Sequence, residues 1–349
     1  MTMADGTRPL RVVQWATGNI GTKSLRGVIE HPDLELVGVR VYDDAKAGHD
    51  AGALCGVDPV GVAATTSIDD VLALDADCIL YMARACDLDE VCRLLASGAN
   101  VVTTRGEFHH PAGMDPDERA RVEAACAEGG TSIHSTGSSP GFVTEALPIV
   151  LTSIQRRLDS ITIDEFADLS QRDSPDLLFT IMGFGAAPST YDERRAGYLA
   201  DAFGPSLRVL GDALSLPLDA VEATGEVALA TRDVEIAAGT LEKGTVAAQR
   251  TTISGMRQGE PVIRMRPTWY CTTDVDADWT LRPTGWRVTV EGDAPFEVDL
   301  RFTASVEDMA ETTPGYTANR AVNSVVAVCA APPGIRTSVD LPQIVANLG

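Results

Sequence analysis

The chain has 349 residues, of which 44% are hydrophobic and 22% are charged, so it is long enough for about two domains and has the composition of a globular protein. Its 50 acidic residues outnumber the 28 basic ones, and the net charge of −22 would repel phosphate backbones and anionic lipid surfaces. We therefore expect neither nucleic acid nor a membrane as a partner. The acidity is typical of soluble proteins, and it would also favour a cationic substrate.

Seven scattered cysteines form no CxxC pair, and several lie in apolar stretches, which is typical of reduced core residues. The N-terminal segment MTMADGTRPL has no apolar signal region, and no apolar run approaches the roughly 18 residues of a membrane span. These features predict a cytoplasmic protein.

Residues 1–150 alternate short apolar runs with longer mixed segments, which is the pattern of βαβ units. This pattern predicts an α/β fold, with a Rossmann doubly wound parallel sheet in the first domain. Helices are clearest at 87–97, which Gly98 should stop, and at 116–128, where Asp115 and Pro116 suit the N-cap and first position. The predicted strands are 10–15, 34–41, 77–82, 100–104 and 131–135.

The segment "ATGNIG" joins the first strand to a helix and resembles the dinucleotide-binding pattern G-x-G-x-x-G. Ala16 replaces its first glycine. Gly18 stands where backbone approaches a pyrophosphate, and Gly21 where helix and strand pack closely. A lone match is weak, but its place after the first strand of a βαβ unit favours a dinucleotide site over a structural turn. The cofactor-binding residues expected here are Thr17, Gly18, Asn19, Ile20 and Gly21.

The end of the second strand should separate the two nicotinamide cofactors, because an acid there binds the ribose hydroxyls of NAD while Arg or Lys accommodates the 2′-phosphate of NADP. The sequence "VRVYDDAKAG" offers Arg40 and Lys46 beside Asp43 and Asp44, so the preference stays open. We expect dual use of NAD and NADP, or a preference for NADP, with Arg40 and Asp43 in contact with the cofactor.

The loops that follow strands 77–82, 100–104 and 131–135 should meet at the carboxyl edge of the sheet, near the nicotinamide. Glu107 is the only carboxylate in the two loops expected nearest to it, "TTRGEFHHP" and "STGSSPGF". The residues of these three loops that we expect to bind the cofactor are Met82, Ala83, Thr104, Gly106, Ser138 and Pro140.

Glu107, His109 and His110 could form a metal site, a solvated turn or the edge of an active site. Adjacent histidines point in divergent directions on an extended chain, and His-x-His or His-x-x-x-His spacing is lacking, so we expect no metal. A solvated turn would suit an arbitrary glutamate. The position of Glu107 at the strand edge favours an active-site acid instead.

Residues 151–310 change pattern and predict an α+β domain with a mixed or antiparallel sheet for substrate binding or dimerisation. Alternating apolar residues flank "EGDAP" over 286–302, and a similar pair of segments flanks Gly259. Residues 191–210 can form a helix. Ala318, Ala321, Val322, Val325 and Cys329 lie on one face of a last helix, so residues 311–349 are expected to return to the Rossmann domain.

Five segments together resemble the native amine dehydrogenases, which are related to 2,4-diaminopentanoate dehydrogenase and more distantly to dihydrodipicolinate reductase. These segments are "ATGNIG", "GEFHHP", "HSTGSSPGF", "MGFG" and "NRAVNSVVAVCAAPPGI". The resemblance implies reductive amination of an aliphatic or cyclic ketone or aldehyde with ammonia and NAD(P)H, the reverse oxidative deamination, and Glu107 as the catalytic acid. Burial of Glu107 among Phe108 and Phe142 would raise its pKa, as acid–base catalysis near neutral pH requires.

The resemblance also implies a homodimer formed through the exposed sheet of the second domain. The alternatives are an imine reductase like dihydrodipicolinate reductase, a ketoreductase, or a non-catalytic NAD(P)-binding sensor; the His-Lys pattern of the reductases is missing around residues 134–141. The expected substrate pocket residues, each of which could instead be core, are Phe108, Phe142, Phe166, Phe179, Met182, Trp269 and Asn319.

Overall fold

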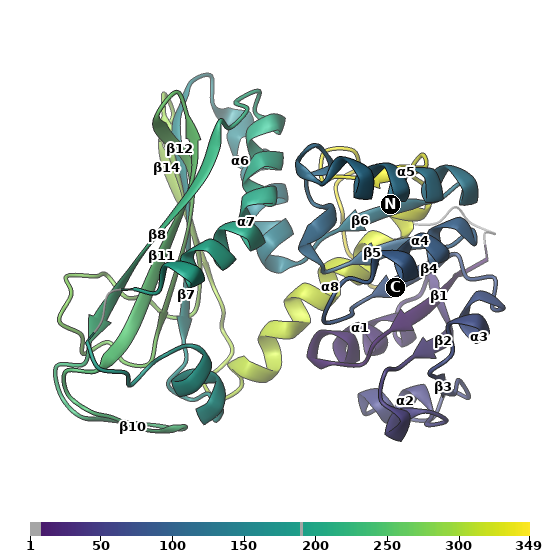
Figure 1. Ribbon diagram of the computed structural model, residues 1–349, viewed down its shortest axis with the longest axis horizontal. Helices are drawn as coiled ribbons and strands as arrows, with labels where there is room; N and C mark the ends of the chain where they lie inside the picture. The colour runs from purple at the N-terminus through teal and green to yellow at the C-terminus, as the bar shows by residue number, and fades with distance from the viewer. Residues whose placement is uncertain (1–7, 189–190) are drawn as a thin grey trace. The chain divides into compact units, whose positions relative to one another are not determined.

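The computed structural model describes residues 8–188 and 191–349, so most of the N-terminal segment examined for a signal lies outside the described residues. The chain divides into two compact units (Figure 1). Residues 1–142 and 313–349 form the first, which we call the parallel-sheet unit, and residues 143–312 form the second, the mixed-sheet unit. No helix in the described part of the chain has the length and apolar character to cross a membrane.

The parallel-sheet unit contains a seven-stranded, all-parallel sheet with the order β15-β6-β5-β4-β1-β2-β3. This confirms the predicted Rossmann topology. It also shows that the chain returns after the last helix to add β15 beside β6. The strands are β1 (Leu10–Trp15), β2 (Leu34–Arg40), β3 (Ala64–Thr65), β4 (Cys78–Tyr81), β5 (Asn100–Thr103), β6 (Ser132–Ser135) and β15 (Gly334–Arg336).

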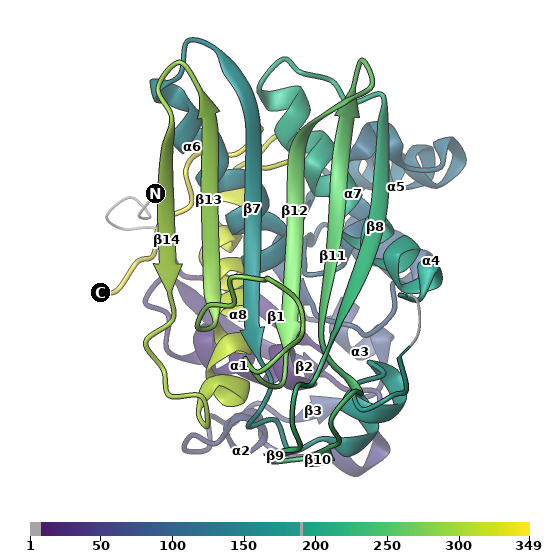
Figure 2. The ribbon, with the colours of Figure 1, turned by 90° about the vertical axis from the view of Figure 1, so that its left-hand side faces the viewer.

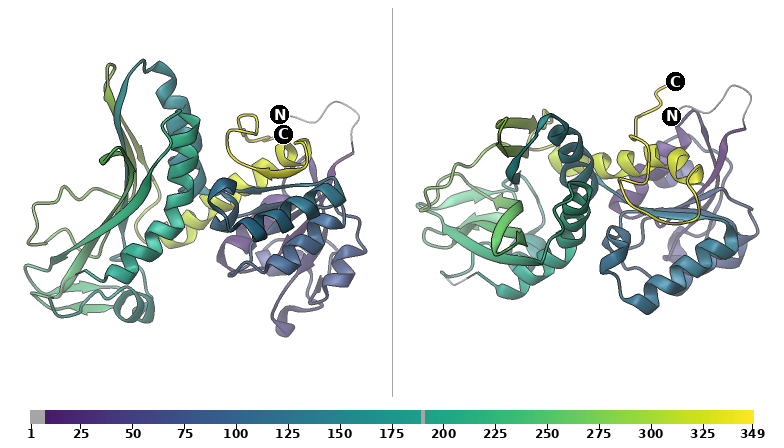
Figure 3. Two further views of the ribbon diagram at one scale, coloured as in Figure 1. Left: turned by 45° about the horizontal axis from the view of Figure 1, so that its top comes forward. Right: turned by 90° about the horizontal axis from the view of Figure 1, so that it is seen from above.

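Helices cover both faces of this sheet (Figure 3). Alternate strand residues point to opposite faces, so one set packs against α1 and α8 and the other against α3, α4 and α5. The predicted N-cap of α5 is confirmed, because the Asp115 carboxylate accepts from the backbone N–H groups of Asp117 and Glu118. The helices are α1 (Asn19–Ile29), α2 (Ala51–Cys55), α3 (Ile68–Leu72), α4 (Leu88–Ala96), α5 (Pro116–Gly129) and α8 (Met309–Cys329).

The mixed-sheet unit is built on a six-stranded sheet with the order β14-β13-β7-β12-β11-β8 (Figure 2). The pairing of β7 with β12 is parallel and the other pairings are antiparallel, which confirms the predicted mixed sheet. A separate two-stranded ribbon lies beside it. The strands are β7 (Leu158–Asp168), β8 (Ala220–Leu229), β9 (Val234–Ile236), β10 (Gly239–Leu241), β11 (Val246–Arg257), β12 (Glu260–Tyr270), β13 (Gly285–Gly292) and β14 (Phe296–Arg301).

Two predicted hairpins are present in this sheet, β11–β12 and β13–β14. The first turns through Gln258 and Gly259, which both have positive φ, as a two-residue hairpin loop requires. The central strand β7 was not singled out in the sequence. It comes from a part of the chain more than 90 residues before its neighbours β12 and β13 (260 − 168 = 92).

The long helix α7 (Glu193–Ala213) packs along one face of the sheet, against β8, β11 and β12. Ile161 and Ile163 of β7 are fully buried on this face, whereas Asp164 and Arg266 lie on the opposite face, which has no helix in front of it in Figure 2. We call the latter the outer face. The remaining helical segments of the chain are η1 (Asp44–Lys46), η2 (Gly106–Phe108), η3 (Pro111–Gly113), η4 (Ser138–Ala146), α6 (Leu147–Leu151), η5 (Thr152–Ile154) and η6 (Asp176–Ile181).

Candidate active site

The turn between β1 and α1 has the geometry of an anion-binding loop. Ala16 has a φ of 69°, a strained value for a residue with a side chain, at the position where the motif has its first glycine. A Cβ atom on Gly21 would lie 2.2 Å from the carbonyl oxygen of Ala16, so this position admits only glycine. Gly18 is the N-cap of α1 and has open space around it. The positive end of the α1 dipole is thus open to a phosphate group.

Hydrogen bonds from buried side chains and from one lysine hold this turn in place. The Gln14 side chain is fully buried, and its Nε2 donates to the carbonyl oxygen of Ala16 at 2.9 Å. Ser24 Oγ donates to Gln14 Oε1 at 2.5 Å. Lys46 Nζ, from the loop after β2, donates to the carbonyl oxygen of Thr17 at 3.0 Å. The turn is therefore fixed before any ligand binds.

Hydrogen bonds connect the loops that leave neighbouring strands at this edge. The backbone N–H of Met82 donates to the carbonyl oxygen of Trp15 at 3.0 Å, and Thr104 Oγ1 donates to Met82 Sδ at 3.5 Å. The N–H of Thr136 donates to the carbonyl oxygen of Thr103 at 2.9 Å. The loops with the predicted cofactor-binding residues therefore lie at one edge of one sheet, and their contact with a cofactor stays a prediction. The predicted residues in these loops are Thr17, Gly18, Asn19, Ile20, Gly21, Met82, Ala83, Thr104, Gly106, Ser138 and Pro140.

Three side chains of the parallel-sheet unit hold buried polar atoms that have no hydrogen-bond partner among the described residues. They are Thr136 Oγ1, Ser139 Oγ, and Nε and Nη1 of Arg40. Buried polar atoms are nearly always hydrogen-bonded in proteins. Together with the open helix end at Gly18, the Thr136 and Ser139 hydroxyl groups fit a polar, phosphate-bearing ligand at this edge.

Glu107 follows β5 in the short helical turn η2, and its side chain is 40% exposed. Its Oε1 accepts from Arg105 Nη2 at 2.8 Å, and Arg105 Nη1 donates to the carbonyl oxygen of Arg84 at 2.8 Å. Burial raises the pKa of the nearby Cys86 to about 12, and the Glu107 carboxylate adds to this shift. Glu107 is thus a reachable carboxylate held by one guanidinium, and it is more open than the sequence predicted.

The two phenylalanines expected around Glu107 have different positions. Phe108 has no exposed area and packs in the hydrophobic core with Val122 and Ile133, so it is a core residue and departs from its predicted place in the pocket. Phe142 is half-buried, and the guanidinium of Arg320 on α8 lies 5.9 Å from the centre of its ring.

The two histidines that follow Phe108 differ in how far they are buried. His109 is 2% exposed and His110 is half-buried. Within residues 8–188 and 191–349, no group of three His, Cys, Asp or Glu side chains is arranged to hold a metal ion.

The other predicted pocket residues fall in several places. Phe179, Met182 and Trp269 pack at the border of the core of the mixed-sheet unit. Phe166 pairs with Thr268 on the outer face of the sheet, and it lines a cavity of about 210 Å³. Because Trp269 is the next residue of β12, it points to the opposite face from Phe166. Asn319 is exposed on α8 of the parallel-sheet unit.

A carboxylate that the sequence did not single out lies on the helix-covered face of the mixed sheet. Trp269 Nε1 donates to Glu165 Oε1 at 3.2 Å, and Trp286 Nε1 donates to Glu165 Oε2 at 3.0 Å. Both indoles come from strands that flank β7. Because both tryptophans are more than 100 positions from Glu165 (269 − 165 = 104), only the strand register brings them to it.

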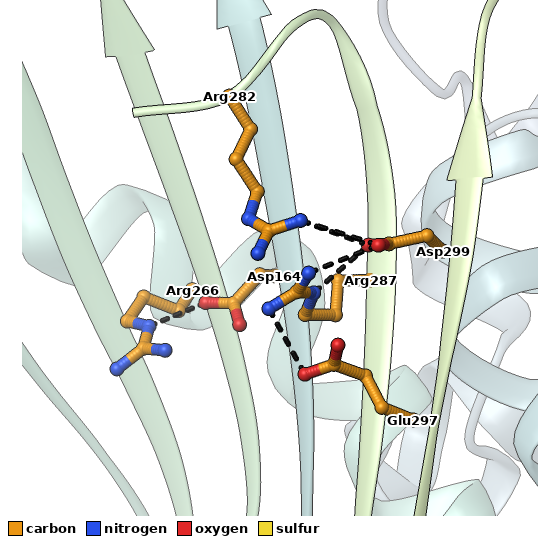
Figure 4. Close-up of polar contacts among 6 residues, drawn as sticks. All are labelled: Asp164, Arg266, Arg282, Arg287, Glu297 and Asp299. Carbon is orange, nitrogen blue, oxygen red and sulfur yellow. Dashed lines mark hydrogen bonds and ion pairs between the residues drawn. The ribbon is translucent and has the colours of Figure 1, made fainter. Parts of the chain in front are cut away.

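The outer face of the mixed sheet carries a network of ion pairs (Figure 4). Arg287 donates to Asp299 at 2.8 Å and to Glu297 at 2.9 Å, and Arg266 pairs with Asp164. The Asp164 side chain is only 7% exposed. The hydrogen bond from Arg287 lowers the pKa of Asp299 below its ordinary value. Arginine and acid alternate across these strands.

Residues 142–349 match the family model of the 2,4-diaminopentanoate dehydrogenase C-terminal domain. The chain is 30% identical over 347 residues to an amine dehydrogenase of Streptomyces virginiae, a match that covers 95% of this chain and 96% of the relative. A 4-hydroxy-tetrahydrodipicolinate reductase of an Anaeromyxobacter species is 34% identical over 120 residues, which cover 33% of this chain and 41% of the reductase.

The solved structure of an amine dehydrogenase from Mycobacterium smegmatis has the same fold, with a TM-score of 0.75. It is 19% identical to this chain, and the match covers 97% of this chain and 98% of that structure. The similarity thus extends through both units.

Proposed function

Because the chain belongs to the amine dehydrogenases, in the family of 2,4-diaminopentanoate dehydrogenase, we propose that it catalyses the reductive amination of an aliphatic or cyclic ketone or aldehyde with ammonia. The reverse reaction is the oxidative deamination of the corresponding amine. The observation that carries the proposal is the position of Glu107. Its partly exposed carboxylate lies on the loop after β5, at the same edge of the sheet as the glycine-rich turn between β1 and α1.

The cofactor in this proposal is NAD(P)H, which supplies the hydride. The N–H groups at the start of α1 bind its diphosphate, since Gly18 brings no side chain into the space above the helix end. Thr136 and Ser139 have buried hydroxyl groups available to orient the nicotinamide end. The turn held by Gln14 and Lys46 makes this binding site rigid.

Glu107 does the proton chemistry in this proposal. Its carboxylate takes a proton from ammonium, which releases the nucleophile ammonia, and then protonates the hydroxyl of the carbinolamine so that water leaves. The carboxylate next stabilises the iminium cation while hydride reaches carbon. Arg105 holds the carboxylate in the absence of substrate, and a substrate ammonium competes with this guanidinium for the same oxygen atoms.

The substrate in this proposal is mainly apolar. Phe142 of the parallel-sheet unit is the candidate for contact with its carbon chain, and burial of a methylene group contributes about 0.8 kcal/mol.

We also propose a homodimer formed through the outer face of the mixed sheet. Arg287, Asp299, Glu297 and the Asp164–Arg266 pair mix both charge signs on this face, so a second copy turned by a two-fold axis can meet it with opposite charges. Arg287→Glu should then give monomers in size-exclusion chromatography with light scattering. Arg194→Glu, on the 91% exposed Arg194 of α7, is the matched control and should stay dimeric. A dimeric Arg287→Glu variant, or a monomeric wild type, contradicts this arrangement.

A cytoplasmic location completes the proposal. All seven cysteines are free thiols, including the fully buried Cys78 and Cys126, and a reducing compartment maintains that state.

The test of the proposed reaction follows the absorbance of NADH and NADPH with a panel of ketones and aldehydes, with and without ammonium. We expect cofactor oxidation that requires ammonium. Cofactor oxidation without ammonium would identify a ketoreductase, cofactor oxidation only when a cyclic imine is added would identify an imine reductase, and cofactor binding without turnover would identify a sensor.

A further inference from the structure

A cavity of about 810 Å³ opens beside the ends of β2 and β4 in the parallel-sheet unit. Its wall includes the ring of Tyr42, which follows β2, and the start of α4. The two loops belong to strands on either side of β1, so the cavity has the place where a Rossmann sheet receives the adenosine part of a dinucleotide. The charged residues of its wall are Arg84, Asp87, Asp89, Glu90, Glu118 and Arg121.

Arg40, the last residue of β2, lies under Tyr42 and away from solvent. Its guanidinium carbon is 3.7 Å from the centre of the Tyr42 ring and 4.9 Å from that of Trp15, and its side chain is 12% exposed. Nη2 pairs with Glu90 Oε1 at 3.5 Å. The positive charge is therefore covered by one ring and partly neutralised by one carboxylate.

Hydrogen bonds hold this cover in place. The Tyr42 hydroxyl accepts from Trp15 Nε1 at 3.0 Å and donates to Glu90 Oε2 at 3.1 Å, and the Tyr81 hydroxyl donates to the same oxygen at 3.2 Å. A phosphate group could reach Nε and Nη1 of Arg40 only if Tyr42 moved and these bonds broke. Arg40 therefore packs under the Tyr42 ring and helps to hold that part of the proposed adenosine site in place.

Asp43 is the first residue beyond this cover, and its side chain is exposed. Oδ1 accepts from the N–H of Ala45 at 2.9 Å, which makes Asp43 the N-cap of η1 and leaves Oδ2 free to accept from a ligand hydroxyl. Asp44 adds a second carboxylate. Lys46, the nearest lysine, is turned toward the carbonyl oxygen of Thr17 and the diphosphate loop.

The charges around the cavity are mostly negative. Four carboxylates and two guanidinium groups lie on its wall, of which Arg121 is already paired with Asp89 and Arg84 is exposed to solvent. Two like charges about 4 Å apart repel by about 1 kcal/mol in water and more where water is excluded. A 2′-phosphate with about two negative charges would therefore be disfavoured beside Asp43, whereas a ribose hydroxyl gains a hydrogen bond there.

We propose that Asp43 selects NAD(H) over NADP(H) in this chain by accepting a hydrogen bond from the adenosine ribose and repelling a 2′-phosphate, while Arg40 has a supporting role. This inference deepens the proposed function and rests on it for the identity of the ligand. It departs from the expectation of dual use or NADP preference, because the sequence could not show that Arg40 is covered by Tyr42.

The test measures the affinity of NADH and NADPH for the purified full-length chain by nucleotide fluorescence, without amine or ketone. We expect the wild type to bind NADH at least about tenfold more tightly than NADPH. Equal affinities or tighter binding of NADPH would overturn the proposal. NADH binding without any amine turnover would instead contradict the proposed function and leave the selectivity intact.

Asp43→Ser isolates the carboxylate, because serine can still cap η1 through its hydroxyl. We expect NADPH to bind about tenfold more tightly and NADH somewhat more weakly than in the wild type. Glu128→Gln, on the exposed end of α5, changes the net charge equally and should leave both affinities unchanged. An Asp43→Ser variant with the selectivity of the wild type refutes the role of Asp43.

A second pair of variants separates the two roles of Arg40. The double variant Arg40→Gln/Glu90→Gln removes both charges, so that no buried charge is left unpaired. If Arg40 is a support, NADH and NADPH affinities fall by a similar factor. A selective loss of NADPH affinity would show that Arg40 binds the 2′-phosphate and would overturn the proposal.

Discussion

Glu107 in the parallel-sheet unit and Glu165 in the mixed-sheet unit are both carboxylates that accept hydrogen bonds from side chains, yet their surroundings differ. Glu107 lies on a loop, is 40% exposed and has one ion pair with a neighbour two residues away. Glu165 lies within a strand and accepts from two indole N–H groups on two other strands. The exposure and single ion pair of Glu107 suit the proton chemistry proposed for it, whereas Glu165 contributes to the packing of its sheet. We therefore propose a chemical role for Glu107, whose partner can be replaced, and a structural role for Glu165, whose partners are fixed by the strand register.

Glu107→Gln should have the largest effect, because it removes the carboxylate that we propose for the proton chemistry. The amide cannot accept a proton from ammonium, so we expect ammonium-dependent kcat to fall by about 10²- to 10⁴-fold. NADH affinity and the unfolding midpoint should stay near those of the wild type. Glu123→Gln, on an exposed α5 residue in an ion pair with Arg119, is the control. A Glu107→Gln rate within a few-fold of the wild type would remove Glu107 from the mechanism.

Gly21→Ala and Gly18→Ala separate folding from ligand binding within the parallel-sheet unit. The Gly21 methyl would meet the Ala16 carbonyl oxygen at 2.2 Å, so we expect a loss of about 1–3 kcal/mol in the free energy of unfolding. The Gly18 methyl meets open space, so stability should change by less than about 1 kcal/mol while cofactor affinity falls. Denaturant titration and NADH binding check both variants. Unchanged affinity in Gly18→Ala would contradict the diphosphate site.

Glu165→Gln tests whether Glu165 stabilises the mixed sheet. One of the two indole N–H groups loses its acceptor in the amide, so we expect a loss of about 1–3 kcal/mol in stability. The variant should keep NADH affinity, because Glu165 lies in the mixed-sheet unit. If Glu165→Gln instead loses turnover at full stability, Glu165 takes part in the reaction and the division between the two acids is wrong.

Asp299→Asn should have the smallest effect. Its hydrogen bond from Arg287 lowers the pKa of the Asp299 carboxyl in the folded protein, so this contact stabilises the fold above the ordinary aspartate pKa and is lost as pH falls through the lowered value. The Asp299 side chain is 38% exposed, so we expect less than about 1 kcal/mol near neutral pH and no difference from the wild type in acid. Thermal unfolding across pH measures it. A difference that grows toward acid would have the wrong sign.

The sequence could predict which loops lie at the edge of the parallel sheet, but it could not predict the contacts across the mixed sheet. The edge of a parallel sheet collects residues that follow successive strands, so Gly18, Gly21 and the loop of Glu107 could be assigned to one edge from their order in the chain. The predicted Asp115 cap was confirmed for the same local reason.

Contacts across the mixed sheet depend on register between distant segments. Strand β7 lies between β12 and β13, and this order brings Trp269 and Trp286 to Glu165. It also puts Phe166 on the outer face, opposite to Trp269. Phe108 looked like a pocket residue because it follows Glu107, yet the η2 turn points it into the core. Local sequence carries no signal for these arrangements.

The most direct test of reductive amination by this chain follows deuterium from the transferable position of labelled NADH or NADPH into the product, with a ketone and ammonium present. We expect one deuterium per turnover on the carbon that bears nitrogen in the amine, only with ammonium, and almost none with Glu107→Gln. Deuterium in an alcohol, or an amine without deuterium, would contradict the assignment of this chain to reductive amination.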